Sequence, residues 1–119
     1  MKDQKIIKTL KDIYGKNLIC VVRFGSSLFK ENPEDIDLIV VVRKTKRLPK
    51  IKNLSIIQLT PKQFLENITE KSPLFAGMYL TGYRVLYGKS FFYKYLPALE
   101  NRISKKDVIY KQGRIYKMV

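Results

Sequence analysis

The chain has 119 residues, with 24 Lys and Arg against 10 Asp and Glu, so its formal net charge is +14; it contains no His and one Cys. This length suits one domain, and a composition that is 45% apolar and 12% aromatic indicates a folded protein rather than a disordered basic tail. The missing His and the single Cys exclude Ser-His and Cys-His catalysis, a zinc or iron–sulfur site built by this chain alone, and an internal disulfide. Its chemistry must therefore use carboxylates, hydroxyls, Lys, Arg and backbone groups.

Hydrophobic periodicity and turn residues predict an alternation of helices and strands along the chain. In order, we expect a helix over 3–15, strands over 18–24, 35–43 and 54–59, helices over 61–68 and 74–81, a strand over 83–87, a helix over 90–102 and a last helix from Ser104. This order predicts an α/β (α+β) fold with a small mixed or antiparallel sheet flanked by helices. We expect one domain over 1–119, with its core in 3–88 and a C-terminal helical segment over 90–119.

The sequence contains no secretory hydrophobic region and no apolar run of the roughly 18 residues that cross a bilayer. We therefore expect a cytoplasmic protein with no membrane partner. The excess of Lys and Arg favours the binding of polyanions such as nucleic acid, nucleotides or acidic partners, although it also fits a surface that is merely solubilised by charge. Six of these cations lie in residues 43–52, which we expect to form an exposed loop around Pro49.

A Gly-Ser-Ser sequence follows strand 18–24 and breaks it. At Gly25 the backbone can approach a ligand closely, the amides that follow can point at an anion, and a Ser hydroxyl can donate to a phosphate oxygen. A short turn or helix through about Lys30 completes the segment. An ordinary turn with a capping Ser would use the same residues, so on its own this motif leaves both interpretations open.

The acids are unevenly placed, because four of the ten, Glu31, Glu34, Asp35 and Asp37, lie within seven residues. Asp35 and Asp37 open the most apolar strand, where positions two apart share one face, and they lie about 6–7 Å apart along the chain. Two such carboxylates repel each other, and a divalent cation removes the conflict. Hard oxygen ligands suit Mg²⁺, which keeps its other positions for water and phosphates. The alternative is a polar end of the strand, with both acids solvated or paired with Lys.

Together, the two motifs have the parts that metal-assisted nucleotidyl transfer needs. At these residues the sequence resembles the minimal nucleotidyltransferases of the DNA polymerase β-like superfamily, whose signature is a strand ending in Gly-Ser, a short helix, and Asp-x-Asp opening the next strand. Residues 23–42, RFGSSLFKENPEDIDLIVVV, carry the resemblance. The site residues that it implies are Gly25, Ser26, Ser27 and Lys30 for the nucleotide phosphates, and Asp35 and Asp37 as catalytic and Mg²⁺-binding residues.

The resemblance implies transfer of a nucleoside monophosphate from a nucleoside triphosphate, which we expect to be ATP, to a hydroxyl group of a protein or nucleic acid. It also implies a small helical partner protein, as in toxin–antitoxin-like pairs. A cluster of aromatic residues over 79–95 is expected to form core together with a homodimer surface, although it could also stack bases.

One departure from the pattern concerns a third carboxylate, which active members usually carry on the third strand. Residues 48–63 contain no Asp or Glu. Gln58 could coordinate a metal weakly but cannot act as a base, and Glu66 and Glu70 are expected on a helix surface. The Arg residues and second Gly of the fuller Gly-Ser motif are also absent. Two alternatives therefore stay open: a degenerate member that binds nucleotide, nucleic acid or a partner without chemistry, and a plain nucleic-acid-binding module.

Overall fold

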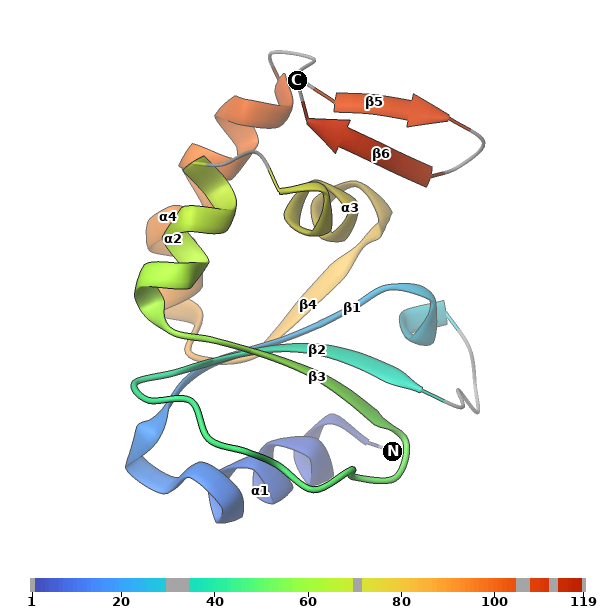
Figure 1. Cartoon of the computed structure of the whole chain (residues 1–119). Coiled ribbons are helices and arrows are strands. Elements are labelled where there is room, and N and C mark those ends of the chain that lie inside the picture. Colours follow the sequence, from blue (N-terminus) through green and yellow to red (C-terminus); the bar gives the residue numbers. More distant parts are fainter. Residues whose placement is uncertain (1, 30–34, 70–71, 105–107, 112–113, 119) are drawn as a thin grey trace.

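A computed structural model describes residues 2–29, 35–69, 72–104, 108–111 and 114–118 of the chain (Figure 1). Its helices are α1 (Asp3–Tyr14), α2 (Pro61–Thr69), α3 (Pro73–Thr81) and α4 (Lys89–Ser104), with short 3₁₀ turns η1 (Gly15–Asn17) and η2 (Ser26–Phe29). Its strands are β1 (Leu18–Phe24), β2 (Ile36–Val42), β3 (Leu54–Leu59), β4 (Tyr83–Tyr87), β5 (Val108–Lys111) and β6 (Arg114–Met118). No helix among these residues is long and apolar enough to span a bilayer.

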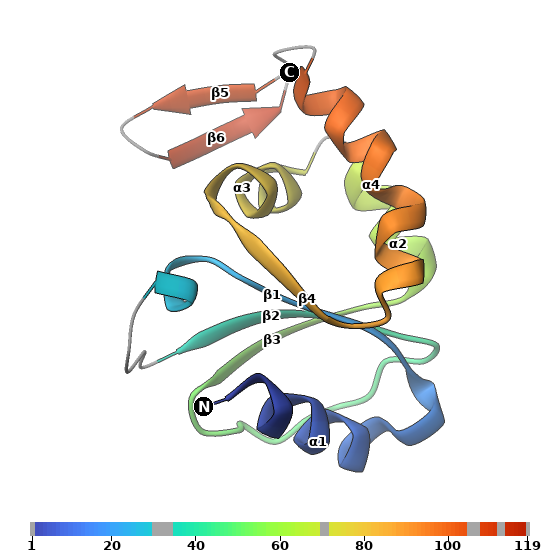
Figure 2. The ribbon, with the colours of Figure 1, turned by 180° about the vertical axis from the view of Figure 1, so that it is seen from behind.

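The main sheet has the strand order β3-β2-β1-β4. Strand β1 runs antiparallel to both β2 and β4, and β2 runs parallel to β3. Helix α1 covers one face of this sheet, while α2, α3 and α4 cover the other (Figures 1 and 2). The predicted α+β fold, a small mixed sheet flanked by helices, is therefore confirmed.

Strand β2 lies inside the sheet and is buried on both faces, as its nearly continuous apolar sequence predicts. Its even-numbered residues pack in a core cluster with Ile6, Leu10 and Tyr14 of α1. Its odd-numbered residues Ile39 and Val41 pack in a second cluster on the side of α2, α3 and α4. Because strand residues alternate between faces, Asp37 lies on the same face as Ile39 and Val41.

The aromatic residues of the second half of the chain fill the core on this second face. The Phe64 ring of α2 makes edge contacts with Phe75, Phe91 and Phe92, at centroid distances of 4.8, 5.2 and 6.4 Å. These residues hold α2, α3 and α4 together as one layer. Within the cluster predicted over 79–95, Phe92 is buried in this core, and Tyr79, Tyr83, Phe91 and Tyr95 pack against it. The expectation that the cluster forms core is therefore confirmed, while the homodimer surface stays a prediction.

The C-terminal segment differs from its prediction. Helix α4 ends at Ser104, and instead of a further helix the chain forms an antiparallel hairpin of β5 and β6, which lies against α3. The expectation of a helical segment over 90–119 is thus wrong beyond α4. The physical reason lies in the sequence itself: Val-Ile-Tyr and Ile-Tyr runs favour paired strands, and the sequence Gln-Gly between them is of a type that favours a turn. Residues 105–107 and 112–113 lie outside the described ranges.

Candidate active site

The Gly-Ser turn and the Asp-x-Asp sequence meet where β1 ends and β2 begins. Phe24, the last residue of β1, is the partner of Asp37 across the two antiparallel strands. Gly25 follows with φ +82°, and a Cβ atom added to it would lie 3.1 Å from Oδ2 of Asp37. The half-buried Asp37 carboxylate therefore lies directly against the backbone of the turn, and glycine allows that approach. The chain then enters η2, with the Leu28 amide donating to the Gly25 carbonyl at 3.2 Å.

The two aspartates differ in their surroundings. Asp35 is exposed just before β2, whereas Asp37 is half-buried within it. Burial raises the pKa of Asp37 above its ordinary value, and the negative charge of Asp35 raises it further. Both effects oppose an ionised Asp37, and a bound cation would relieve both. Two carboxylates beside a turn able to hold phosphates fit Mg²⁺, which commonly takes one or two carboxylates and completes its shell with water and substrate phosphates.

Replacing Gly25 with Ala is expected to weaken nucleotide binding and to destabilise the fold by about 1–2 kcal/mol, because the residue has positive φ and its new Cβ would press on the Asp37 carboxylate. Gly15→Ala is a matched control, since Gly15 also has positive φ (+55°) but a Cβ there would meet nothing within 4 Å. Thermal unfolding and titration with a non-hydrolysable nucleotide measure the two effects. Equal losses of nucleotide binding in both variants would contradict the assigned role of Gly25.

The third strand has a serine where a third carboxylate would lie beside Asp37. Ser55 is the partner of Asp37 in the parallel pairing of β2 and β3. Leu54 and Ile56 on either side of it pack in the α1-side cluster, so Ser55 faces the same side as Asp37, and it is exposed. Among the residues that the structure describes, no three His, Cys, Asp or Glu side chains gather into a metal site.

Gln58 does not supply the missing third ligand on β3. It is the partner of Val40, which faces α1, so it lies on the opposite face from Asp37. Its amide is bound to the backbone of Lys46: Nε2 donates to the carbonyl at 2.6 Å, and Oε1 accepts from the amide at 3.1 Å. The expectation that Gln58 could be a metal ligand is therefore wrong. Glu66 lies in α2, which follows the far end of β3, and Glu70 lies outside the described residues.

A buried arginine that sequence reasoning missed holds the Gly-Ser turn. The Arg23 side chain is 8% exposed, and its guanidinium donates to Oδ1 of Asp3 at 2.9 Å, to the Ser27 carbonyl at 2.8 Å and to the Ser27 hydroxyl at 3.3 Å. Arg84 of β4 binds the other oxygen of Asp3 at 2.7 Å. This network ties the start of α1 to the turn. The signal for it was an Arg in the otherwise apolar strand LICVVRF, one residue before the Gly.

The same network changes the interpretation of Ser27. Ser27 is 1% exposed and its hydroxyl group faces Arg23, so the side chain positions the turn and does not face a ligand. The Ser26 side chain and the whole of Lys30 lie outside the described residues, as do Glu31 and Glu34. The structure therefore brings Gly25 and Asp37 into contact, places Asp35 beside them, and gives Ser27 a supporting position.

Arg23→Met is expected to lower the free energy of unfolding by about 2–3 kcal/mol, because it leaves the buried Ser27 carbonyl and hydroxyl without their donor and Asp3 with one partner fewer. Arg84→Met removes the same kind of contact to Asp3 from a side chain that is 51% exposed, and is expected to cost less than about 1 kcal/mol. Urea denaturation measures both. Similar losses for the two variants would show that Arg23 has no special role in holding the turn.

Comparison with known proteins finds similarity only among solved structures. No protein-family model and no curated protein matches the chain. One similar structure is a MntA–HpeT toxin–antitoxin carrying two Asp-to-Glu substitutions: it is 16% identical, with 90% of this chain and 97% of that chain covered and a TM-score of 0.47. Another is a toxin–antitoxin with AMP-PNP, which is 17% identical over 90% of this chain and 97% of that one, with a TM-score of 0.46.

A third similar structure is a tri-AMPylated HEPN toxin from Shewanella oneidensis in complex with MNT antitoxin. It is 19% identical, with 88% of this chain and 92% of that chain covered and a TM-score of 0.43. Because these identities and scores are low, we base the function on the residues of this chain.

Proposed function

We propose that this protein is a Mg²⁺-dependent nucleotidyltransferase that moves a nucleoside monophosphate from a nucleoside triphosphate, with ATP as the expected donor, to a hydroxyl group of a protein or nucleic acid. The observation that carries the proposal is the contact between the Gly25 backbone and the Asp37 carboxylate, with Asp35 beside them. Amides that would bind phosphate and two carboxylates that would bind the metal thus lie next to each other, as transfer at a phosphate requires.

Different residues of the chain would bind the triphosphate and Mg²⁺. The amides that follow Gly25 would hold the triphosphate, and the Arg23 network would keep this turn in place against α1. Asp35 and Asp37 would hold Mg²⁺, which when bound supplies positive charge to the phosphates. The acceptor hydroxyl oxygen forms a bond to the α-phosphorus, the bond from that phosphorus to the bridging oxygen of the β-phosphate breaks, and pyrophosphate leaves. The hydroxyl proton passes to water.

A second candidate function, nucleotide binding without chemistry, is favoured by one observation. Ser55 occupies the place on β3 beside Asp37 where a third carboxylate would complete the site. Such a protein would bind a nucleoside triphosphate through the same turn and aspartates but transfer nothing.

The test is incubation of the protein with Mg²⁺, α-labelled nucleoside triphosphate, and protein and nucleic-acid acceptors. Transfer of label with release of pyrophosphate is the expected result. Binding of a non-hydrolysable triphosphate without any transfer of label would instead identify a binding protein. If neither binding nor transfer occurs, both functions are wrong.

A further inference from the structure

The loop that joins β2 to β3, residues 43–53 and hereafter the basic loop, is the most cationic segment of the described chain. Between residues 38 and 65 the sequence contains no Asp or Glu. Six cations of the loop are exposed: Arg43, Lys44, Lys46, Arg47, Lys50 and Lys52. A cationic patch without acids attracts polyanions more strongly than the same charges dispersed among acids.

The basic loop is held in one conformation although it contains no regular structure. Asn17 binds the backbone of Lys44 twice, accepting from its amide at 2.8 Å and donating to its carbonyl at 2.6 Å. Gln58 binds the backbone of Lys46 in the same double manner. Leu48 and Ile51 pack against the α1-side core. The exposed cations are therefore displayed on an ordered backbone, which reduces the entropy lost when they bind a partner.

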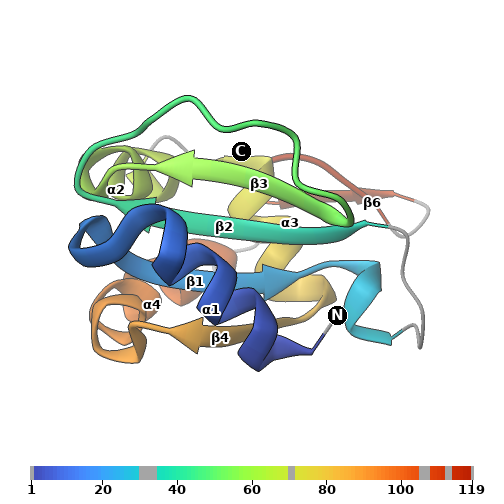
Figure 3. The ribbon, with the colours of Figure 1, turned by 90° about the horizontal axis from the view of Figure 1, so that it is seen from below.

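The basic loop leads to the candidate active site. It runs beside β3 from the end of β2 toward the end of the sheet where β1 and η2 lie (Figure 3). Strand β3 has six residues and spans about 20 Å. At the end of the loop, the carbonyl of Asn53 accepts from the amide of Ile36, the residue between the two aspartates, at 2.8 Å. A polyanion lying along the loop would thus end near Asp35 and Asp37.

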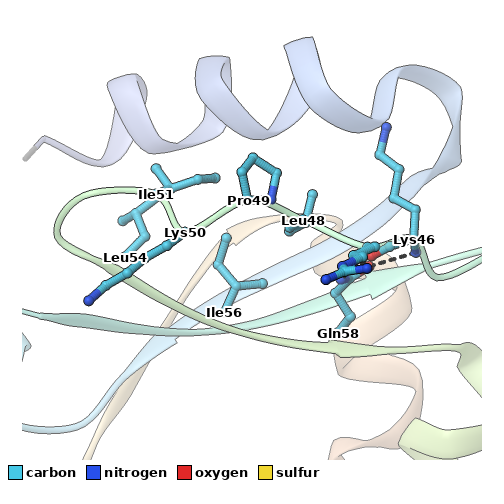
Figure 4. A pocket seen from close by; sticks show the side chains of 9 residues that line it. Lys46, Leu48, Pro49, Lys50, Ile51, Leu54, Ile56 and Gln58 are labelled. Carbon is cyan, nitrogen blue, oxygen red and sulfur yellow. Dashed lines mark hydrogen bonds between the residues drawn. The ribbon is translucent and has the colours of Figure 1, made fainter.

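Under the basic loop lies a cavity of about 290 Å³ (Figure 4). Its walls combine apolar side chains, including Leu48, Ile51 and Ile56, with the cations Arg47 and Lys50. A nucleotide of a nucleic-acid strand combines a flat base with an anionic phosphate, so its base fits the apolar side chains and its phosphate fits the cations. In a duplex the bases are paired and stacked, so this match favours a single strand.

We propose that the basic loop and its cavity bind single-stranded nucleic acid, and that this nucleic acid is the acceptor whose hydroxyl group reaches Asp35 and Asp37. The binding step stands on the loop alone. The transfer step rests on the proposed nucleotidyltransferase function.

The test measures binding of a dye-labelled single-stranded RNA of about 12 nucleotides by fluorescence anisotropy, without nucleotide or Mg²⁺. We expect Arg47→Ala combined with Lys50→Ala to weaken binding about tenfold and to reduce the slope of log K against log salt by about 1.4, which corresponds to two lost phosphate contacts. The matched control is Lys62→Ala combined with Lys89→Ala, which removes the same charge from exposed positions in α2 and α4, across the sheet. The control is expected to bind within about twofold of the natural protein.

Each alternative result overturns the proposal or one of its two steps. Equal weakening by the two double variants would mean that only net charge attracts the RNA. Tighter binding of a duplex, or of an acidic peptide of the same charge, would assign the loop to another partner. If RNA binds as predicted and no label is transferred to it, the binding step stands and the acceptor role fails.

Discussion

Asp37→Asn is expected to reduce nucleotidyl transfer by about 10³-fold and, at neutral pH, to make the folded protein more stable. The first effect follows from loss of a charged ligand beside the reacting phosphate. The second follows from the pKa of Asp37, which burial and the charge of Asp35 raise in the folded state. An ionised Asp37 is less favourable in the folded than in the unfolded chain, and Asn removes this cost.

The pH dependence of the stability gain follows from the same shift. A carboxyl whose folded-state pKa is raised stabilises the fold when it is protonated, and that stabilisation is lost as pH rises through the folded-state value. The gain from Asn is therefore expected at pH 7 and should disappear near about pH 3, where Asp37 is protonated in both states. Urea denaturation at the two pH values and transfer of α-label measure the two effects.

Two companion variants sharpen this test. Asp35→Asn is expected to reduce transfer as strongly but to stabilise less, because Asp35 is exposed. Asp12→Asn removes the same charge from an exposed position in α1 and should change neither property. Transfer that persists in both Asp35→Asn and Asp37→Asn would rule out the proposed site.

Ser55→Asp is expected to raise the rate of nucleotidyl transfer about tenfold or more and to tighten Mg²⁺ binding. Position 55 is beside Asp37 in the strand pairing, faces the same side of the sheet and is exposed, so a third carboxylate there costs little burial. Without Mg²⁺ the added repulsion should lower the thermal midpoint of unfolding, and Mg²⁺ should restore it. Transfer assays and thermal unfolding across a Mg²⁺ titration provide the measurements.

Gln58→Glu is the control for Ser55→Asp. It adds the same charge to the same strand, but on the face toward α1, where the side chain binds the Lys46 backbone. No gain in rate is expected. If both variants accelerate transfer equally, the effect is general electrostatics and the assignment of position 55 is wrong; if neither does, the site does not need a third carboxylate there.

Local sequence patterns predicted the regular elements well in the first part of the chain. The strands expected over 18–24, 54–59 and 83–87 are β1, β3 and β4, because apolar β-branched runs bounded by turn residues have few other ways to be buried. The prediction failed after Ser104, where a helix was expected and antiparallel pairing between two short neighbouring strands produced β5 and β6 instead. Strand preference depends on such pairing more than helix preference does.

For the candidate site, the amino-acid sequence showed which residue types are present: a glycine turn after one strand, two acids on one face of the next, and no acid on the third. How these residues meet could be seen only in the folded chain. The registers of β1 with β2 and of β2 with β3 bring Asp37 against Gly25 and beside Ser55, while Gln58 faces away and Ser27 turns to the buried Arg23. Register depends on contacts between segments far apart in the chain, and a shift of one residue would reverse every face.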